Sequence, residues 1–184
     1  MIVERRTRLL LLLLGTLCTI LAAAPATAQR GIQPASSFSL YLPVISVASV
    51  VSPPEQLMVD LTNQLRQQHG CAPLNLSPQL MVATRAHSQD MAAHNYFGHT
   101  DLAGHDPAWR DQQAGYPGIA GWENIAAGFG DAALVVNTWY NETPPNDGHR
   151  RNMLNCALTD IGVGFSYNGN STYGTYWTQD FGQR

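Results

Sequence analysis

The chain shows two hydrophobic periodicities, and the order in which they occur most restricts its fold. Leucines recur at helical spacing from Leu57 to Leu65, and Gly70 ends that pattern. Ser77 is a good N-cap and Pro78 suits a first helical turn, so a second helix is predicted to start there. Two helices therefore open the folded region.

The helical pattern continues in two shorter segments and then gives way to alternation. A helix is predicted over 107–114, and Asp131 caps another whose apolar stripe reaches Trp139. Apolar residues then alternate with glycine and serine over 161–167. The β-forming segment 173–181 follows an Asn-Gly turn, which predicts a hairpin. Helices first and antiparallel strands last predict an α+β domain, because a doubly wound parallel sheet needs the two to alternate.

The first residues have the composition of a secretory signal peptide. Arginines at positions 5, 6 and 8 precede an apolar run from Leu9 to Ala24, and small residues at 26–28 suit a signal peptidase. The run is short for the roughly 20 apolar residues that a transmembrane helix needs. We therefore expect residues 1–28 to be cleaved after Ala28, together with Cys18, and the chain to be secreted without a stable transmembrane anchor.

A linker is predicted between the signal peptide and the domain. Residues 29–54 are rich in proline and serine and show no lasting helical period, so the folded domain is expected at 55–184. An apolar patch at 40–51 allows three interpretations: a strand docked on the domain, a spacer that faces a membrane or cell wall, or an aggregation-prone segment.

The charge of the exported chain argues against two classes of partner. Three of the ten basic residues and one of the thirteen acidic residues lie in the signal peptide, so seven arginines, no lysine and twelve acidic residues remain. Binding to nucleic acid or to an anionic membrane normally requires a basic patch, which so few arginines do not build. The remaining length suits one domain, and we expect a monomer.

Loss of the signal peptide leaves an even pair of cysteines in an oxidising compartment. We predict that Cys71 and Cys156 form a disulfide. The alternative is that a cysteine acts as a nucleophile with His149, but a single pair outside the cell usually stabilises the fold.

Glu142 and His149 form the first candidate pair of site residues. Glu142 falls three residues after Trp139, so helical spacing places it on the buried stripe of that helix, where a carboxylate needs a partner. A Pro-rich turn brings His149 back only seven residues later, within reach of Glu142. The alternative, that Glu142 only ends the helix at the surface, has nearly equal weight.

His99 and Glu123 are two further candidates, each isolated in the sequence. His99 lies in an aromatic and glycine-containing segment after the second helix, and Glu123 begins an apolar segment. The other histidines suggest no site. His87 and His94 are predicted on the inner face of the second helix, whereas His69 and His105 resemble surface residues.

Seven short motifs then occur in order over almost the whole of 55–184 and resemble one family. They are His87-Ser88-Gln89-Asp90-Met91, Phe97-Gly98-His99, Gly121-Trp122-Glu123-Asn124-Ile125, Trp139-Tyr140-Asn141-Glu142, Gly148-His149-Arg150, Ile161-Gly162-Val163-Gly164 and Tyr176-Trp177-Thr178-Gln179-Asp180-Phe181-Gly182. In these motifs the chain resembles the CAP superfamily (cysteine-rich secretory proteins, antigen 5 and pathogenesis-related proteins), in its bacterial SCP-domain branch. The resemblance implies an α-β-α sandwich with a central antiparallel sheet.

The same resemblance implies a cleft that holds two histidines and two glutamates, which in some members bind zinc or another divalent cation. The matching residues are His99, Glu123, Glu142 and His149. They are also the candidate catalytic residues if the protein is an enzyme. The family's reported lipid binding makes us expect a binding module for a cation and for a lipid or envelope component.

Two other functions remain open from the sequence. One is a hydrolase, either metal-dependent or built from a serine such as Ser88 with His149 and a glutamate. The other is a hydrogen-bonded polar cluster that only holds loops together. Catalysis is not general to the family, so binding is the first hypothesis.

Overall fold

The computed structural model describes residues 50–184. The predicted signal peptide and all but the end of the predicted linker lie outside these residues. The described elements are α1 (Pro53–Gln68), β1 (Asn75–Leu76), α2 (Pro78–His94), α3 (Pro107–Gln113), β2 (Ile119–Ala127), α4 (Ala132–Tyr140), α5 (Gly148–Met153), β3 (Asp160–Tyr167) and β4 (Thr175–Gln183). Helix α1 thus starts two residues before the predicted domain boundary. No helix in this part of the chain is long and apolar enough to cross a membrane.

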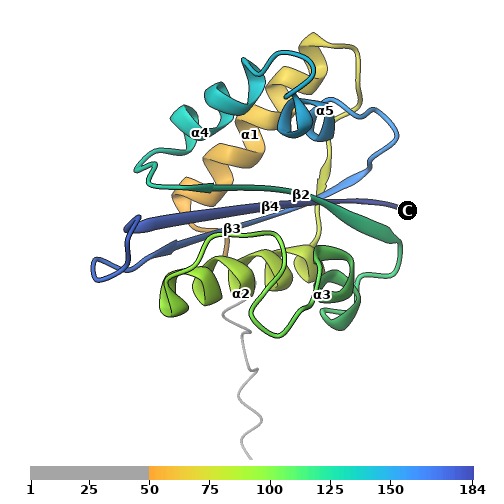
Figure 1. Ribbon diagram of the computed structural model, residues 1–184. Helices are drawn as coiled ribbons and strands as arrows, with labels where there is room; N and C mark the ends of the chain where they lie inside the picture. Colours follow the sequence, from red (N-terminus) through yellow and green to blue (C-terminus); the bar gives the residue numbers. More distant parts are fainter. Residues whose placement is uncertain (1–49) are drawn as a thin grey trace, which may run out of the picture. The chain divides into compact units, whose positions relative to one another are not determined.

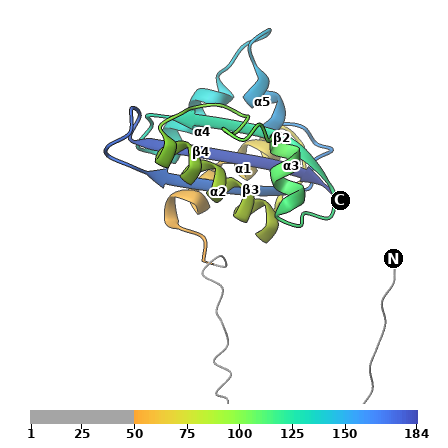
Figure 2. The same ribbon diagram turned by 60° about the horizontal axis from the view of Figure 1, so that its bottom comes forward.

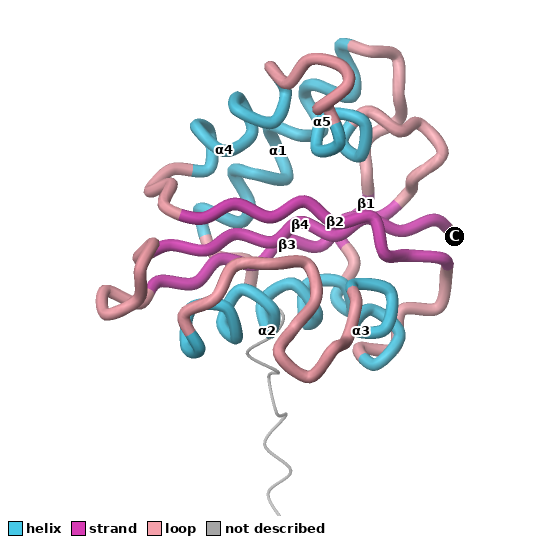
Figure 3. Tube along the Cα trace, viewed as in Figure 1, coloured by secondary structure: helices cyan, strands magenta, loops and turns pink. Residues whose placement is uncertain are grey.

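The sheet forms the middle layer of the domain. Its strand order is β1-β3-β4-β2, with β3 and β4 paired as the predicted antiparallel hairpin and β2 antiparallel to β4 at one edge. The two-residue strand β1 adds a parallel pair at the other edge, so the sheet is mixed. Helices α1, α4 and α5 cover one face, and α2 and α3 cover the other (Figures 1, 2 and 3). The predicted α+β class and α-β-α sandwich are confirmed.

Local capping explains where the two long helices begin. The Glu55 carboxylate accepts a hydrogen bond from the Ser52 backbone N–H at 2.9 Å, as the last residue of a capping box does. Ser77 accepts a hydrogen bond from the Leu80 N–H at the start of α2. Prolines occupy the first turn of both helices, where a missing N–H costs no helical bond.

Two glycines of β3 allow α2 to lie directly on the sheet. A β-carbon at Gly162 would lie 2.3 Å from the Leu80 carbonyl carbon, and one at Gly164 would lie 2.2 Å from the Thr84 carbonyl oxygen. Both distances are far inside van der Waals contact. The glycines of the predicted strand are therefore needed for the approach of α2 to the sheet.

The loops around α5 are held by a disulfide and a buried arginine. Cys71 and Cys156 form the predicted disulfide, which links the end of α1 to the segment after α5. Arg66 is fully buried and donates hydrogen bonds to four backbone carbonyls, those of Ala72, Met153, Asn155 and Leu158. These contacts fix the position of α5, which carries His149.

Strand β2 was not predicted, and its burial explains why. Ala126 packs in the core beneath α1 and α4, whereas its neighbour Ile125 packs with Met91 of α2. Both faces of β2 are covered by helices, so the strand lacks the polar and apolar alternation that marks a half-exposed strand. Gly121, at φ +110°, interrupts its register with β4.

Candidate functional site

The first histidine–glutamate pair lies between β2 and the α2–α3 layer. His99 Nδ1 is 2.7 Å from Glu123 Oε1, and the Arg110 Nη2 donates to Glu123 Oε2 at 2.6 Å. The Glu123 side chain is only 1% exposed, whereas the His99 side chain is 53% exposed. A buried carboxylate is thus neutralised by a buried guanidinium and holds an exposed imidazole ring in place.

Arg110 is the partner of Glu123 that the sequence did not predict. It lies on α3, where Asp106 caps the first turn by accepting a hydrogen bond from the Trp109 N–H. Its Nη1 also donates to the His99 and His105 carbonyls, so the arginine fixes the loop before α3. The only available signal was an arginine on a short helix, which is common on protein surfaces.

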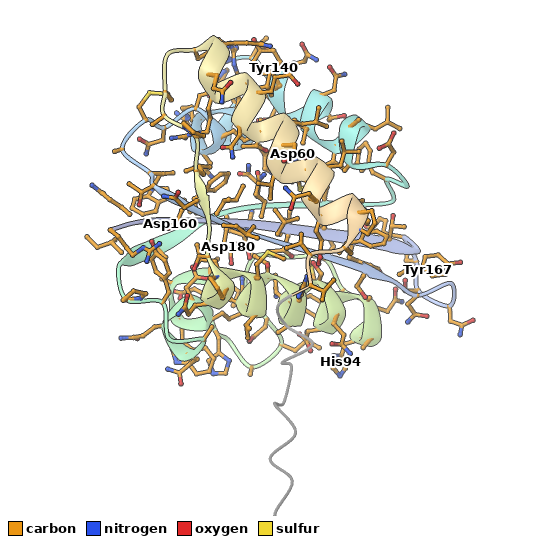
Figure 4. The ribbon with its side chains drawn as sticks, turned by 180° about the vertical axis from the view of Figure 1, so that it is seen from behind. Asp60, His94, Tyr140, Asp160, Tyr167 and Asp180 are labelled. Atoms are coloured by element: carbon orange, nitrogen blue, oxygen red, sulfur yellow. A yellow bond between two sulfur atoms is a disulfide. The ribbon has the colours of Figure 1, made fainter. Side chains whose placement is uncertain are left out.

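His87 lies beneath this pair. Its Nε2 is 3.0 Å from the Gly98 carbonyl oxygen and 3.8 Å from Glu123 Oε2. Burial lowers the pKa of His87, and the Arg110 charge acts in the same direction, although Glu123 opposes both. The prediction that His87 faces inward is confirmed. His94, predicted on the same inner face, is instead exposed at the end of α2 and paired with Asp90 (Figure 4).

The second pair lies on the other side of β2. His149 Nδ1 is 2.5 Å from Glu142 Oε1, and the His149 backbone N–H donates to Glu142 Oε2. The pairing is as predicted, but the predicted reason was wrong. Helix α4 ends at Tyr140, so Glu142 lies in the following turn and is 21% exposed rather than part of the helical stripe. The His149 ring stacks on Trp139 at 5.4 Å.

Two neighbouring residues of β2, Glu123 and Asn124, make their side-chain contacts in opposite helical layers. Glu123 faces α2 and α3, whereas Asn124 donates to the His149 carbonyl of α5 at 3.1 Å. Asn152 of α5 reaches both, because its amide donates to the Glu123 carbonyl and to the Asn124 side-chain oxygen. The four predicted site residues therefore form two pairs that flank the edge strand, one in each layer.

The donor set does not form a ready metal site. Among residues 50–184, no group of three or more histidine, cysteine, aspartate or glutamate side chains is placed to hold one metal ion. Both Nδ1 atoms of the pairs already face carboxylates, which leaves the Nε2 atoms of His99 and His149 as ligands. Two imidazole nitrogens fall short of the three protein ligands of a catalytic zinc site.

Ser88 has a structural role. It is fully buried on α2, and its hydroxyl lies 3.0 Å from the Gly164 carbonyl oxygen and 2.8 Å from the Thr178 hydroxyl. In the described part of the chain it bonds to no histidine. A nucleophile needs a base within hydrogen-bonding reach, so Ser88 does not form the triad with His149 that the sequence left open as an alternative.

Two further carboxyl groups lie under Glu123 and were not singled out from the sequence. Asp180 of β4, labelled in Figure 4, is the register partner of Glu123. Asp180 and Asp111 of α3 are both buried. Burial raises the pKa of Asp111 to about 6, and the nearby Glu123 charge adds to the effect. Burial and the charges of Glu123 and Asp111 raise the pKa of Asp180 well above its usual value.

A polar groove runs beside the second pair. It has a volume of about 500 Å³ and lies between Trp122 of β2 and the α5 residues Arg150, Arg151 and Asn152. Arg150 also lies over the Tyr140 ring, 5.2 Å from its centre. The groove is therefore lined by residues that flank the two pairs, since Trp122 precedes Glu123 on β2 and Arg150 follows His149 on α5.

The family model for the cysteine-rich secretory protein family, CAP, matches residues 59–181. The chain belongs to the CAP family. It is 38% identical over 136 residues to the uncharacterized protein YkwD of Bacillus subtilis (strain 168), covering 74% of this chain and 49% of YkwD. The uncharacterized membrane protein YlbC of the same strain is 32% identical over 130 residues, which cover 71% of this chain and 34% of YlbC. The CAP chain thus spans half or less of these relatives.

Solved structures agree with the family. An extracellular protein from Bacillus anthracis str. Ames that contains an SCP domain aligns with a TM-score of 0.61 and 30% identity, over 73% of this chain and 45% of that chain. An outer surface protein from Borrelia burgdorferi has the same fold, with a TM-score of 0.60 and 20% identity over 70% of this chain and 91% of that chain.

Proposed function

We propose that this CAP protein is an exported binding module whose ligand contacts His99 and His149 and lies in the polar groove beside α5. The observation that carries the proposal is the exposure of the two rings. Each imidazole is held through Nδ1 by a carboxylate, and the His99 and His149 side chains are 53% and 31% exposed. Within residues 50–184 the Nε2 atom of neither ring makes a hydrogen bond, so both Nε2 atoms remain available to a ligand.

A purely structural cluster explains this arrangement less well. Groups that only hold loops together gain most when they are buried, as Arg66 is in its cage of carbonyls. Here the glutamates hold the rings in fixed orientations while the rings remain accessible. Fixed orientation lowers the entropy lost on binding, which favours a recognition site.

The groove indicates the class of ligand. Arg150 and Arg151 line it together with the Asn155 side chain. Arg151 is paired with Asp147 at 3.4 Å but has an exposed side chain, so its charge stays accessible to a ligand. These donors suit a polar, anionic component of the cell envelope better than an apolar lipid. The extracellular B. anthracis relative supports the same location for this chain.

The test compares retention of the exported chain on insoluble peptidoglycan and on phosphatidylglycerol vesicles. We expect retention on peptidoglycan, and at least a tenfold loss for the double variant His99→Ala, His149→Ala. The matched control is His94→Ala, because His94 also pairs with a carboxylate but lies at the end of α2. Equal retention of the double variant would contradict the proposal, and vesicle binding alone would show that the ligand is a lipid.

Calorimetric titration with zinc chloride tests the predicted cation separately. The two Nε2 atoms predict weak, exchangeable zinc at most. Stoichiometric binding that disappears in the double variant would instead show that the two pairs move together around a metal. Peptide or ester turnover lost in Glu123→Gln would establish the hydrolase alternative.

A further inference from the structure

Arg150 differs from the other arginines of residues 50–184 in the groups that it contacts. Arg85, Arg110, Arg151 and Arg184 each pair with a carboxylate, and Arg66 donates to four backbone carbonyls. Within these residues the Arg150 guanidinium makes neither an ion pair nor a hydrogen bond, and Arg150 is partly exposed in the polar groove beside α5. An arginine keeps its charge at every physiological pH, so this charge is available to a ligand.

The ring of Tyr140 orients this guanidinium. The Arg150 Cζ atom lies 5.2 Å from the centre of the ring, which is a cation–π contact. Tyr140 is itself held, because its hydroxyl lies 2.9 Å from His69 Nε2 and the two rings meet edge to face. A guanidinium that lies on a ring keeps its N–H donors in one plane, where a carboxylate can accept two parallel hydrogen bonds. Arg150 is therefore oriented before a ligand binds.

The charges of the groove favour a ligand with one negative charge. Arg150, Arg151 and Asp147 line it, so two positive charges face one negative charge and the sum is +1. A phosphate monoester carries about −1.5 to −2 charges at pH 7 and would lie close to the Asp147 carboxylate. A carboxylate carries a single charge and is planar, as the bidentate contact with Arg150 requires.

Two asparagine side chains add a hydrogen-bond acceptor and a donor to the same groove. Asn152 uses its Nδ2 atom for the Glu123 carbonyl and the Asn124 side chain, so its Oδ1 atom is the acceptor that remains. Asn155 Oδ1 accepts from the Ala157 N–H at 3.0 Å, so its Nδ2 atom is the donor that remains. Both asparagines line the groove and are partly exposed. A peptide bond supplies one N–H donor and one carbonyl acceptor, which match this pair.

We propose that the polar groove beside α5 binds the free carboxyl end of a peptidoglycan peptide. The terminal carboxylate pairs with Arg150, a peptide bond meets Asn152 and Asn155, and small apolar side chains lie against Trp122 and Leu154, which also line the groove. This inference rests on the proposed function and names the part of the envelope ligand that the groove recognises. Arg150 then distinguishes a free carboxyl end from a blocked one.

The probe is N-acetyl-D-alanyl-D-alanine, titrated calorimetrically into the exported chain and compared with its C-terminal amide. A hydrogen bond to a charged group contributes enough that we expect the free acid to bind at least about tenfold more tightly than the amide. Equal binding of the acid and the amide, or no saturable binding of the acid, would overturn the proposal. Tighter binding of the L,L isomer would indicate the carboxyl end of a protein and would contradict a peptidoglycan peptide.

Substitutions of the two groove arginines test the bidentate contact. Arg150→Lys keeps the charge but loses the planar donors, so we expect it to weaken binding of the free acid at least about tenfold. Arg151→Gln removes a charge from the same groove, and we expect a smaller loss because Asp147 already pairs with Arg151. Unchanged binding in Arg150→Lys would show that the groove attracts the carboxylate by charge alone and would contradict the proposal.

Failure of this inference and failure of the proposed function give different results. The acid and the amide could bind equally while peptidoglycan retention is still lost in His99→Ala, His149→Ala. In that case the binding module stands, and only the carboxyl end is wrong as its target. If the double variant is retained on peptidoglycan as well as the unchanged chain, the proposed function itself is wrong.

Discussion

The two histidine–glutamate pairs beside β2 have the same contact but different surroundings. Glu123 is buried, bonded to Arg110 and close to two other acids. Glu142 is partly exposed and lies in the turn before α5, and the segment after α5 carries the disulfide to Cys71. The comparison teaches that one kind of pair can be held in two ways. In the α2–α3 layer a buried charge network holds the ring, and in the α5 layer covalent and backbone contacts hold the loop.

Loss of the disulfide should have the largest effect, and it should act on the α5 side. The bond closes a loop across 85 residues, for which the chain-entropy model gives roughly 4–5 kcal/mol. We expect Cys71→Ala, Cys156→Ala to lose about that much unfolding free energy in urea. The His99–Glu123 contact should survive in the folded fraction. Imidazole NMR signals report on both histidines. If the signals of His99 and His149 are both lost in the variant, the two layers are not stabilised independently.

Arg110→Met should lower the free energy of unfolding by nearly as much, in this case by destabilising the α2–α3 layer. The variant leaves Glu123 buried and without its cation, which costs about 3–5 kcal/mol. Arg150→Met is the matched control on α5, where we expect a loss below about 1 kcal/mol because the arginine is partly exposed. Urea denaturation at pH 7 measures both, and similar losses would remove the contrast between the layers.

The buried carboxyl groups of the α2–α3 layer predict that the free energy of unfolding depends on pH. The pKa of Asp111 is raised to about 6, so the folded state keeps a proton that the unfolded chain releases near pH 4. Stability is therefore full below about pH 4 for this group and falls by roughly 3 kcal/mol as pH rises through 6. Asp111→Asn should remove this fall, because burial raises the pKa of that carboxyl itself.

Asp60→Asn is the control for that slope. Asp60 is an exposed residue of α1 on the opposite layer, so the substitution should leave the pH dependence unchanged (Figure 4). Asp160 has a lowered pKa, because its bonds to Arg184, Thr159 and Tyr116 outweigh burial, and its contribution is lost only at more acidic pH. A fall in stability between pH 4 and 6 that persists unchanged in Asp111→Asn would disprove the role of this buried carboxyl.

The smallest effect concerns the proton positions on three histidines. Contacts to carboxylates predict that neutral His99 and His149 carry the proton on Nδ1, whereas His87 carries it on Nε2. Nitrogen-15 NMR distinguishes the two tautomers. The Nε2–H form of His149 would show that Glu142 does not hold the ring in solution. The two pairs would then not share the same histidine–glutamate contact.

Local rules predicted much of the framework. The starts of α1 and α2 follow from proline and serine at their first turns, and the β3–β4 hairpin follows from alternation and an Asn-Gly turn. The short helix α5 and strand β1 were missed, since six and two residues are too few to show a period. Helical spacing failed for Glu142 because it was extended past the end of α4 at Tyr140.

The sequence by itself therefore determined the α+β class, the family and the cysteine pair, and it singled out the four candidate site residues. Only the tertiary structure decided that Glu123 and Asn124 connect to opposite layers, that Arg110 neutralises Glu123, and that Asp111 meets Asp180. The reason is physical. Capping and periodicity act between residues that are close in the chain. The layer that Glu123 or Asn124 faces depends instead on β2, and because helices cover both faces of β2, its sequence shows no alternation of polar and apolar residues.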